Sequence, residues 1–132
     1  MAIDIHIHIE YKKRKKNKYS YGGYFKGDRI YGVFSVLAGI IDYQPPLYPL
    51  RGLPGDITKE TLRDYQIGKC DWHDVGWLTP DELGDCLKEA DRRYSDEDED
   101  DAWLRPYWIL YEYMMEHENY GEQTRMIFWF DN

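Results

Sequence analysis

The first ten residues of the chain hold the densest group of side chains that could do chemistry. Asp4, His6, His8 and Glu10 alternate strictly with isoleucine. Because successive side chains of a β-strand point to opposite faces, this pattern predicts one isoleucine face and one face with two imidazoles between two carboxylates. The polar face is then a wetted surface, a set of cross-strand pairs, or a site.

A metal site is the sharpest chemical interpretation of that face. If the two terminal strands are neighbours, Asp4, His6 and Asp131 meet at one end of a sheet, and His73 can reach them from its loop. Imidazoles with carboxylates suit zinc, manganese or iron. Such a metal could supply a hydroxide nucleophile for phosphoester or amide hydrolysis. The sequence thus keeps a small metal-dependent hydrolase, with zinc or manganese as its cofactor, as one candidate function, although no residue is singled out as catalytic.

A second group of candidates could bind a ligand. Arg51 lies in a loop with four prolines, and its guanidinium could hold a phosphate or carboxylate through two parallel hydrogen bonds. Its alternative role is to tie that loop to an acidic neighbour. His73 and Trp77 belong to a tryptophan-rich segment and complete this predicted ligand-binding set. The chain contains no P-loop, nucleophile elbow or Gly-x-Gly-x-x-Gly pattern.

Strands at both ends of the chain are expected to position these residues. One runs from Ala2 to about Tyr11, and another closes the chain from Arg125. Two strongly apolar terminal strands most naturally pair in the middle of one sheet. The segment 19–25 returns from the first strand as a weaker second strand, and its glycines indicate a bulge.

Four segments have helical character. A short apolar helix is expected over 31–41, and a second helix over 58–67, capped by Thr58 or Asp56. Thr79-Pro80-Asp81-Glu82 predicts a third helix that begins with a capping box. Two adjacent aromatic stripes predict a fourth over 102–118. Residues 69–77 form an irregular segment or a strand, and residues 44–56 form a packed loop.

These elements together predict an α+β fold. We expect a single domain, residues 1–132, with a small, mainly antiparallel sheet whose N- and C-terminal strands are central and about three helices packed on it.

The charge of the chain is unevenly distributed. The formal net charge is −8, yet six of the seven residues from Lys12 to Lys18 are basic, and Asp96 to Asp101 is a run of six acids. Each run is either a solvated loop or a functional contact. Because wrapping a nucleic-acid backbone requires neutralising cations, the acidic balance argues against direct nucleic-acid binding. The two cysteines, Cys70 and Cys86, together with the lack of a signal-peptide pattern or an apolar run long enough to cross a bilayer, indicate reduced thiols in a cytoplasm and no membrane association.

Several segments together resemble a family of small uncharacterised proteins found in phages, prophages and some bacterial genomes. They are Asp4-Ile-His with Glu10, residues 31–39, Pro49-Leu-Arg-Gly-Leu-Pro, His73 ahead of Trp77-Leu-Thr, and the closing Ile127-Phe-Trp-Phe-Asp-Asn. The similarity runs from end to end, and its most specific part is the Phe-Trp-Phe-Asp-Asn ending. The chain departs from the family at Ala2-Ile3, where the family often has Gly-Cys, and at its acidic run. The resemblance implies a mobile-element setting and no particular chemistry.

The resemblance, the small size and the acidic charge favour a function by binding. The expected function is that of a phage or mobile-element accessory protein that counteracts a host defence, either by inhibiting a defence protein or by sequestering its nucleotide signal. The expected partner is accordingly a host protein or a small nucleotide ligand, in the host cytoplasm. The sequence leaves open whether the protein forms a homo-oligomer.

Overall fold

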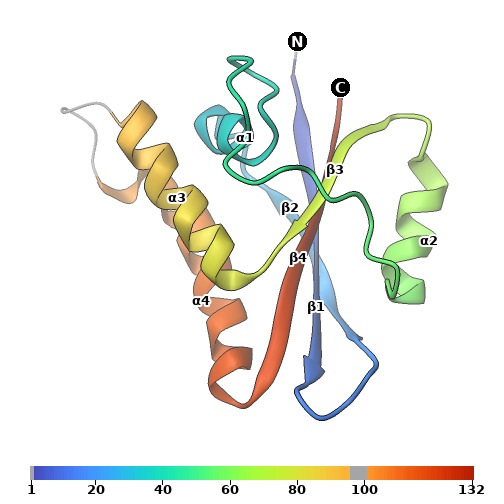
Figure 1. Cartoon of the computed structure of the whole chain (residues 1–132). Coiled ribbons are helices and arrows are strands. Elements are labelled where there is room, and N and C mark those ends of the chain that lie inside the picture. Colours follow the sequence, from blue (N-terminus) through green and yellow to red (C-terminus); the bar gives the residue numbers. More distant parts are fainter. Residues whose placement is uncertain (1, 96–100) are drawn as a thin grey trace.

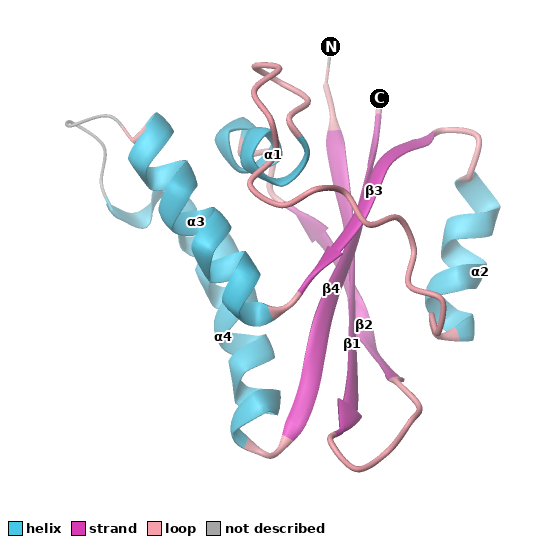
Figure 2. Cartoon of the chain, viewed as in Figure 1, coloured by secondary structure: helices cyan, strands magenta, loops and turns pink. Residues whose placement is uncertain are grey.

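A computed structural model of the chain describes residues 2–95 and 101–132. Within these residues the chain folds into a four-stranded sheet with helices on both faces (Figures 1 and 2). The elements in chain order are β1 (Asp4–Lys13), β2 (Ser20–Gly27), α1 (Tyr31–Ala38), α2 (Lys59–Gly68), β3 (Trp72–Leu78), α3 (Pro80–Tyr94), the 3-10 helix η1 (Asp101–Leu104), α4 (Arg105–Asn119) and β4 (Glu122–Asp131).

The two terminal strands lie side by side in the centre of the sheet. The strand order is β2-β1-β4-β3, and every neighbouring pair is antiparallel. β1 and β4 pair without interruption over their whole length, from Asp4 opposite Asp131 to Lys13 opposite Glu122. The predicted α+β fold with central terminal strands is confirmed.

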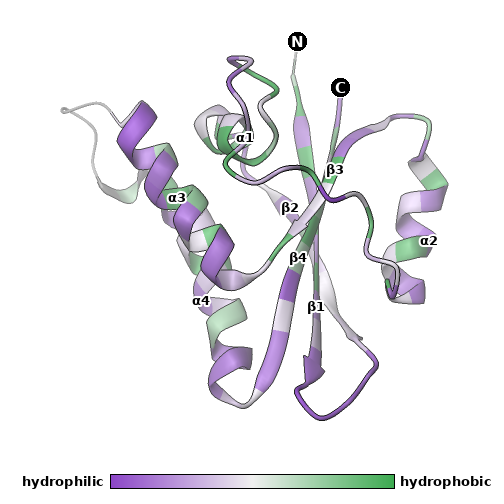
Figure 3. Ribbon diagram, in the orientation of Figure 1, coloured by the Kyte–Doolittle hydropathy of each residue, from purple (hydrophilic) through white to green (hydrophobic). Residues whose placement is uncertain are grey.

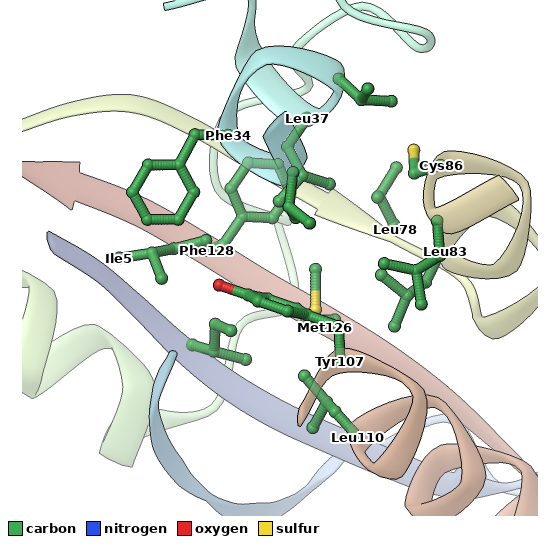
Figure 4. Close-up of a cluster of buried hydrophobic side chains, with 14 of the residues drawn as sticks. Ile5, Phe34, Leu37, Leu78, Leu83, Cys86, Tyr107, Leu110, Met126 and Phe128 are labelled. Carbon is green, nitrogen blue, oxygen red and sulfur yellow. The ribbon is translucent and has the colours of Figure 1, made fainter. Parts of the chain in front are cut away.

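The isoleucine face of β1 carries the core. Ile5, Ile7 and Ile9 are completely or almost completely buried, and the cross-strand neighbours Phe128 and Phe130 extend the same apolar surface. Helices α1, α3 and α4 pack on this face, where Tyr107, Leu83 and Phe34 meet the sheet side chains (Figure 4). The strict alternation of β1 thus provides the apolar surface on which these three helices are held.

Helix α2 lies on the opposite face of the sheet. Asp64 and Tyr65 from this helix contact His8 and Trp129 of the sheet, and in Figure 1 α2 stands apart from α1, α3 and α4. The fold therefore has four helices rather than about three. Three of them pack on the apolar face, and the fourth, α2, packs on the polar face over His8 and Trp129.

The helix starts expected from the sequence are present. Thr79 accepts a hydrogen bond from the backbone of Glu82, and the Glu82 carboxylate accepts one from the backbone of Thr79, which completes the capping box of α3. Thr58 caps α2 by accepting from the backbone of Thr61. Helix α1 ends at Gly39, whose φ of 69° is the left-handed conformation that a glycine adopts without strain.

The proline-rich segment 44–56 is an ordered loop that packs along the core. Its backbone is fastened at two points, by Leu47 N–H donating to the carbonyl of Val36 and by Gly52 N–H donating to the carbonyl of Val75. Leu47, Tyr48 and Leu50 are half-buried against the core. The predicted packed loop is found.

Of the two charge runs, the structure describes the basic one in full and the acidic one only at Asp101. The basic residues after β1 form the exposed turn of the β1–β2 hairpin, a strongly hydrophilic segment in Figure 3. The acidic residues 96–100 lie outside the described residues. Within the described part of the chain, no helix is long and apolar enough to cross a membrane.

Candidate functional site

The polar face of β1 is organised as a row of hydrogen-bonded groups that runs along the sheet. Its four members, Asp4, His6, His8 and Glu10, each bond to a partner from another element. Because α2 packs on this face, the row changes from half-buried at the Asp4 end to fully buried at the Glu10 end. The polar face is therefore neither open surface nor a single cluster, and each of its members has its own partners.

His6 is the central member of a chain of three side chains. Its Nε2 lies 2.6 Å from Oδ2 of Asp131, and its Nδ1 lies 2.7 Å from the hydroxyl of Tyr24. With the imidazole neutral, Nε2–H donates a hydrogen bond to the carboxylate of Asp131, which only accepts, and the Tyr24 hydroxyl donates to the lone pair of Nδ1. The Trp72 ring packs against the imidazole at 4.8 Å between centroids. The His6 side chain remains 16% exposed.

His8 repeats the same arrangement two residues further along the strand, but inside the protein. Its Nδ1 lies 2.8 Å from the Tyr21 hydroxyl and its Nε2 lies 2.7 Å from Oδ2 of Asp64. The side chain is only 2% exposed, and this burial lowers the pKa of His8 below its ordinary value, against the opposing pull of Asp64. His8 is accordingly a neutral imidazole that joins β1 to α2.

Glu10 is completely buried and accepts five hydrogen bonds. Its Oε1 accepts from Nε and Nη2 of Arg125, at 2.9 and 2.6 Å. Its Oε2 accepts from the backbone N–H and the hydroxyl of Thr58 and from the hydroxyl of Thr61, at 2.9, 2.6 and 2.7 Å. Arg125 also pairs with Asp56 at 2.7 Å. This network fastens the N-terminus of α2 to the two central strands, so it is structural.

The four residues of the predicted metal site do not surround one point. Asp4, His6 and Asp131 do share the polar face at one sheet end, but the Asp4 carboxylate is held by Arg29 at 2.6 and 3.2 Å, which lowers the pKa of Asp4. His73 lies on the apolar face, because it stands opposite Phe130 in the β3–β4 register, and its ring stacks on that phenylalanine. Among the described residues, no group of three or more histidine, cysteine, aspartate or glutamate side chains could hold a metal ion.

His73 has its own hydrogen-bond partners at the sheet edge. Its Nδ1 lies 2.6 Å from the carboxylate of Asp74, and its Nε2 lies 2.8 Å from the side-chain oxygen of Asn132. The residue is therefore part of a small polar group at the ends of β3 and β4, separated by the sheet from His6.

Arg51, the predicted anion-binding residue, is engaged by the protein itself. Its guanidinium forms a bidentate pair with Glu82, donates to the carbonyl of Trp77 at 3.1 Å and lies over the Trp77 ring at 4.6 Å. This pairing raises the pKa of Arg51 and lowers that of Glu82. The sequence left two roles open for Arg51. In the structure it has the second role, because it ties the proline-rich loop to an acidic neighbour, Glu82. The predicted ligand set is divided, since Arg51 contacts Trp77 but neither contacts His73.

Sequence reasoning missed the two tyrosines of the polar face. Strict alternation along β2 would put Tyr21 and Tyr24 on opposite faces of the sheet. A bulge opposite Ile9 and Glu10, with Gly23 at a φ of 130°, adds one residue to β2 and turns both rings to the same side. The adjacent glycines signalled the bulge, but only the pairing register shows its consequence.

The comparisons with known proteins add no relative to this description. No protein-family model, curated protein or solved structure matches the chain. The function is therefore argued from the residues and their arrangement.

Proposed function

We propose that this protein is an accessory protein of a phage or another mobile element, which counteracts a host defence by binding a host protein. The observation that carries the proposal is the concentration of negative charge on one helical layer. The described residues of α3, η1 and α4 include nine acidic and four basic residues, whereas the other described residues include thirteen basic and eleven acidic. Such a one-sided charge attracts and orients a partner with a basic surface.

The outer surface of α4 combines this charge with apolar contact area. Glu112 and Glu116 are exposed one turn apart, and Ile109, 58% exposed, lies on the same side of the helix. Beside the helix, an apolar depression of about 290 Å³ lies between β2 and α4 and is lined by Phe25, Tyr113 and others. Acidic side chains on the same helix as an apolar depression suit a basic protein surface that offers an apolar side chain.

A protein partner is favoured over a nucleotide signal. The residue expected to hold a phosphate, Arg51, already has its guanidinium neutralised by Glu82. Anionic nucleotides would also meet the net negative charge of the chain. The basic hairpin turn has the opposite charge, and it joins β1 to β2 rather than belonging to the helical layer.

The alternative function, a small metal-dependent hydrolase, is supported by one observation. Three of its four residues, Asp4, His6 and Asp131, lie at the same end of the polar face. A site would have to recruit a further ligand in place of His73, and Arg29 would have to release Asp4. Elemental analysis of the purified protein and melting in the presence of a chelator test it, because a stoichiometric metal or a lower melting temperature in chelator is expected only of a metal protein.

The proposed function is tested in bacteria that carry a defence system and are challenged with a phage that the system restricts. Expression of the protein should raise the plating efficiency of that phage, and affinity capture should recover a defence component at stoichiometric amounts. The double variant Glu112→Lys with Glu116→Lys should lose both effects, because it reverses the charge of the outer surface of α4.

A matched control changes the net charge equally on the other side of the sheet. The pair Glu60→Lys with Asp71→Lys alters two exposed residues on and just after α2 and should behave as the native protein. Melting curves of both variants establish that each is folded. Equal loss in the two variants, or no captured component across a panel of defence systems, would contradict the proposal.

A further inference from the structure

The polar face contains two sets of tyrosine, histidine and aspartate with the same internal connections. In both sets the tyrosine hydroxyl reaches Nδ1 of the histidine, at 2.7 or 2.8 Å, and the carboxylate reaches Nε2, at 2.6 or 2.7 Å. This is the arrangement in which a base accepts the proton of a hydroxyl while a carboxylate holds the imidazole in the required tautomer. The binding function proposed above uses neither set.

The two sets differ in their access to solvent. In the set around His8 the imidazole is buried, α2 supplies the carboxylate of Asp64, and Tyr21 is half-buried. The set around His6 stands at the open end of the sheet, and Tyr24 is 44% exposed. Tyr24 is therefore the more exposed of the two tyrosines, and the half-buried Tyr21 offers an internal comparison with the same hydrogen-bond pattern and less contact with solvent.

The charges beside Tyr24 indicate what kind of reactant fits. Lys26 lies directly opposite His6 in the β1–β2 register and, two residues from Tyr24 on the same strand, faces the same side of the sheet. It is exposed, and its positive charge lowers the pKa of nearby Asp4. The second cation of this region, Arg29, is already neutralised by Asp4. Lys26 thus offers one positive charge on the side of Tyr24, while the carboxylates of Asp64, Asp131 and Asp4 act on the Tyr24 hydroxyl with negative charge. The site therefore suits an electrophile with no more than a single negative charge, as in a phosphodiester.

We propose that Tyr24 is a nucleophile toward small phosphodiesters, with His6 as its general base and Asp131 as the residue that positions His6. Tyr24 Oη attacks phosphorus, and its proton passes to Nδ1 of His6. The bond from phosphorus to the leaving oxygen breaks on the side opposite Tyr24, and the electron pair stays on that oxygen, which takes a proton from water, while His6 returns its proton to the solvent. The products are an alcohol and a phosphodiester between Tyr24 and the remaining part of the reactant.

The raised pKa of Tyr24 explains why a base is needed, and the net charge of the chain explains why a small reactant is expected. Burial, together with the carboxylates of Asp64, Asp131 and Asp4, raises the pKa of Tyr24, so the phenol stays protonated at neutral pH until a base removes its proton. A long polyanionic strand would be repelled by a chain with a net charge of −8, whereas a small diester carries only one charge to the site.

The test measures covalent labelling by bis(4-nitrophenyl) phosphate and by a 4-nitrophenyl ester of a nucleotide, both in the presence of a chelator. The expected result is one adduct per chain by intact mass, release of one 4-nitrophenolate per adduct, and location of the adduct on Tyr24 by peptide mapping. Tyr24→Phe should abolish the adduct. Tyr21→Phe, the matched control from the set of Tyr21, His8 and Asp64, should keep the adduct.

The roles of His6 and Asp131 have their own readouts. His6→Gln should slow labelling by about 100-fold or more, since a positioned base contributes on the order of 100- to 10,000-fold, and its rate should keep rising into alkaline solution, where the phenol ionises by itself. Asp131→Asn should slow labelling, and Asp131→Glu, which retains a carboxylate, should recover part of the rate. Melting curves of all variants show whether each is folded.

Several outcomes would overturn the proposal. They are no adduct with either probe on the folded protein, an adduct that persists in Tyr24→Phe, or equal rates in the native protein and folded His6→Gln. A short single-stranded oligonucleotide serves as the comparison reactant. Attachment of the oligonucleotide in place of the small diesters would overturn the assignment of a small reactant.

Discussion

The buried pair of Glu10 and Arg125 offers the sharpest test of how the polar face is built. Replacing Glu10 by glutamine keeps the size of the side chain and removes its charge. Every atom that faces the carboxylate is a donor, and neither Arg125 nor the backbone N–H of Thr58 can become an acceptor. In either orientation of the new amide, its NH₂ group therefore faces Arg125 or the backbone N–H of Thr58, and that donor loses its acceptor.

The expected cost follows from the partners that remain. Removing one member of a buried ion pair costs about 3–5 kcal/mol, because the other charge is left without compensation. Asp56 still pairs with Arg125 at 2.7 Å, so we expect a value near the lower limit, about 3 kcal/mol. With a urea dependence of about 2 kcal/mol per molar, the unfolding midpoint should fall by about 1.5 M. The melting temperature should fall by on the order of 10 °C.

The measurement is urea unfolding followed by tryptophan fluorescence and by circular dichroism. Glu60→Gln is the matched control, since Glu60 is exposed in the first turn of the same helix, and it should change the free energy of unfolding by no more than about 0.5 kcal/mol. Equal midpoints for the two variants would refute the reasoning, because Glu10 could not then be a buried charge that fastens α2 to the sheet.

Three smaller perturbations test other buried groups. Burial lowers the pKa of His8 from 6.5, so below pH 6.5 the unfolded chain binds a proton at this residue more readily than the folded protein does, and stability falls as the pH falls. Between about pH 7.5 and 5.5 the urea midpoint should therefore fall less in His8→Gln than in the native protein. Burial raises the pKa of the Cys86 thiol to about 12 while Cys70 is exposed; iodoacetamide should therefore add one label to the folded protein, on Cys70, and two in urea, as counted by intact mass. A Cβ at Gly27 would lie 2.5 Å from a side-chain carbon of β1, so Gly27→Ala should lose about 1–3 kcal/mol of stability in urea unfolding, while Gly55→Ala, which meets no atom within 4 Å, should stay within about 1 kcal/mol of the native value.

The elements of the fold were largely predictable from local patterns. The alternation in β1, the capping box at Thr79 and the cap at Thr58 are short-range signals, and each has a local physical cause that does not depend on the rest of the chain. The pairing of the terminal strands was also predictable, because two strands with apolar faces bury most surface when both lie in the middle of the sheet.

The candidate site was less predictable because it depends on register and on which element covers it. His73 pairs with Phe130 of β4 while His6 pairs with the adjacent Trp129, and one position along a strand moves a side chain to the other face of the sheet. The bulge in β2 brings together two side chains that strict alternation would separate, because it places Tyr21 and Tyr24 on the same face of the sheet. Neither result follows from the spacing of residues along the chain.

The sequence by itself determined that β1 has an apolar face and a polar face, and that the apolar face belongs to the core. Only the tertiary structure decided the fate of the polar face, because that depends on where α2 packs. By covering His8 and Glu10 and leaving Tyr24 and His6 at the open end, α2 turns one repeated pattern into a buried structural network and an accessible group of reactive side chains. The physical reason is that burial and partners, rather than residue type, set the protonation and the reactivity of a polar side chain.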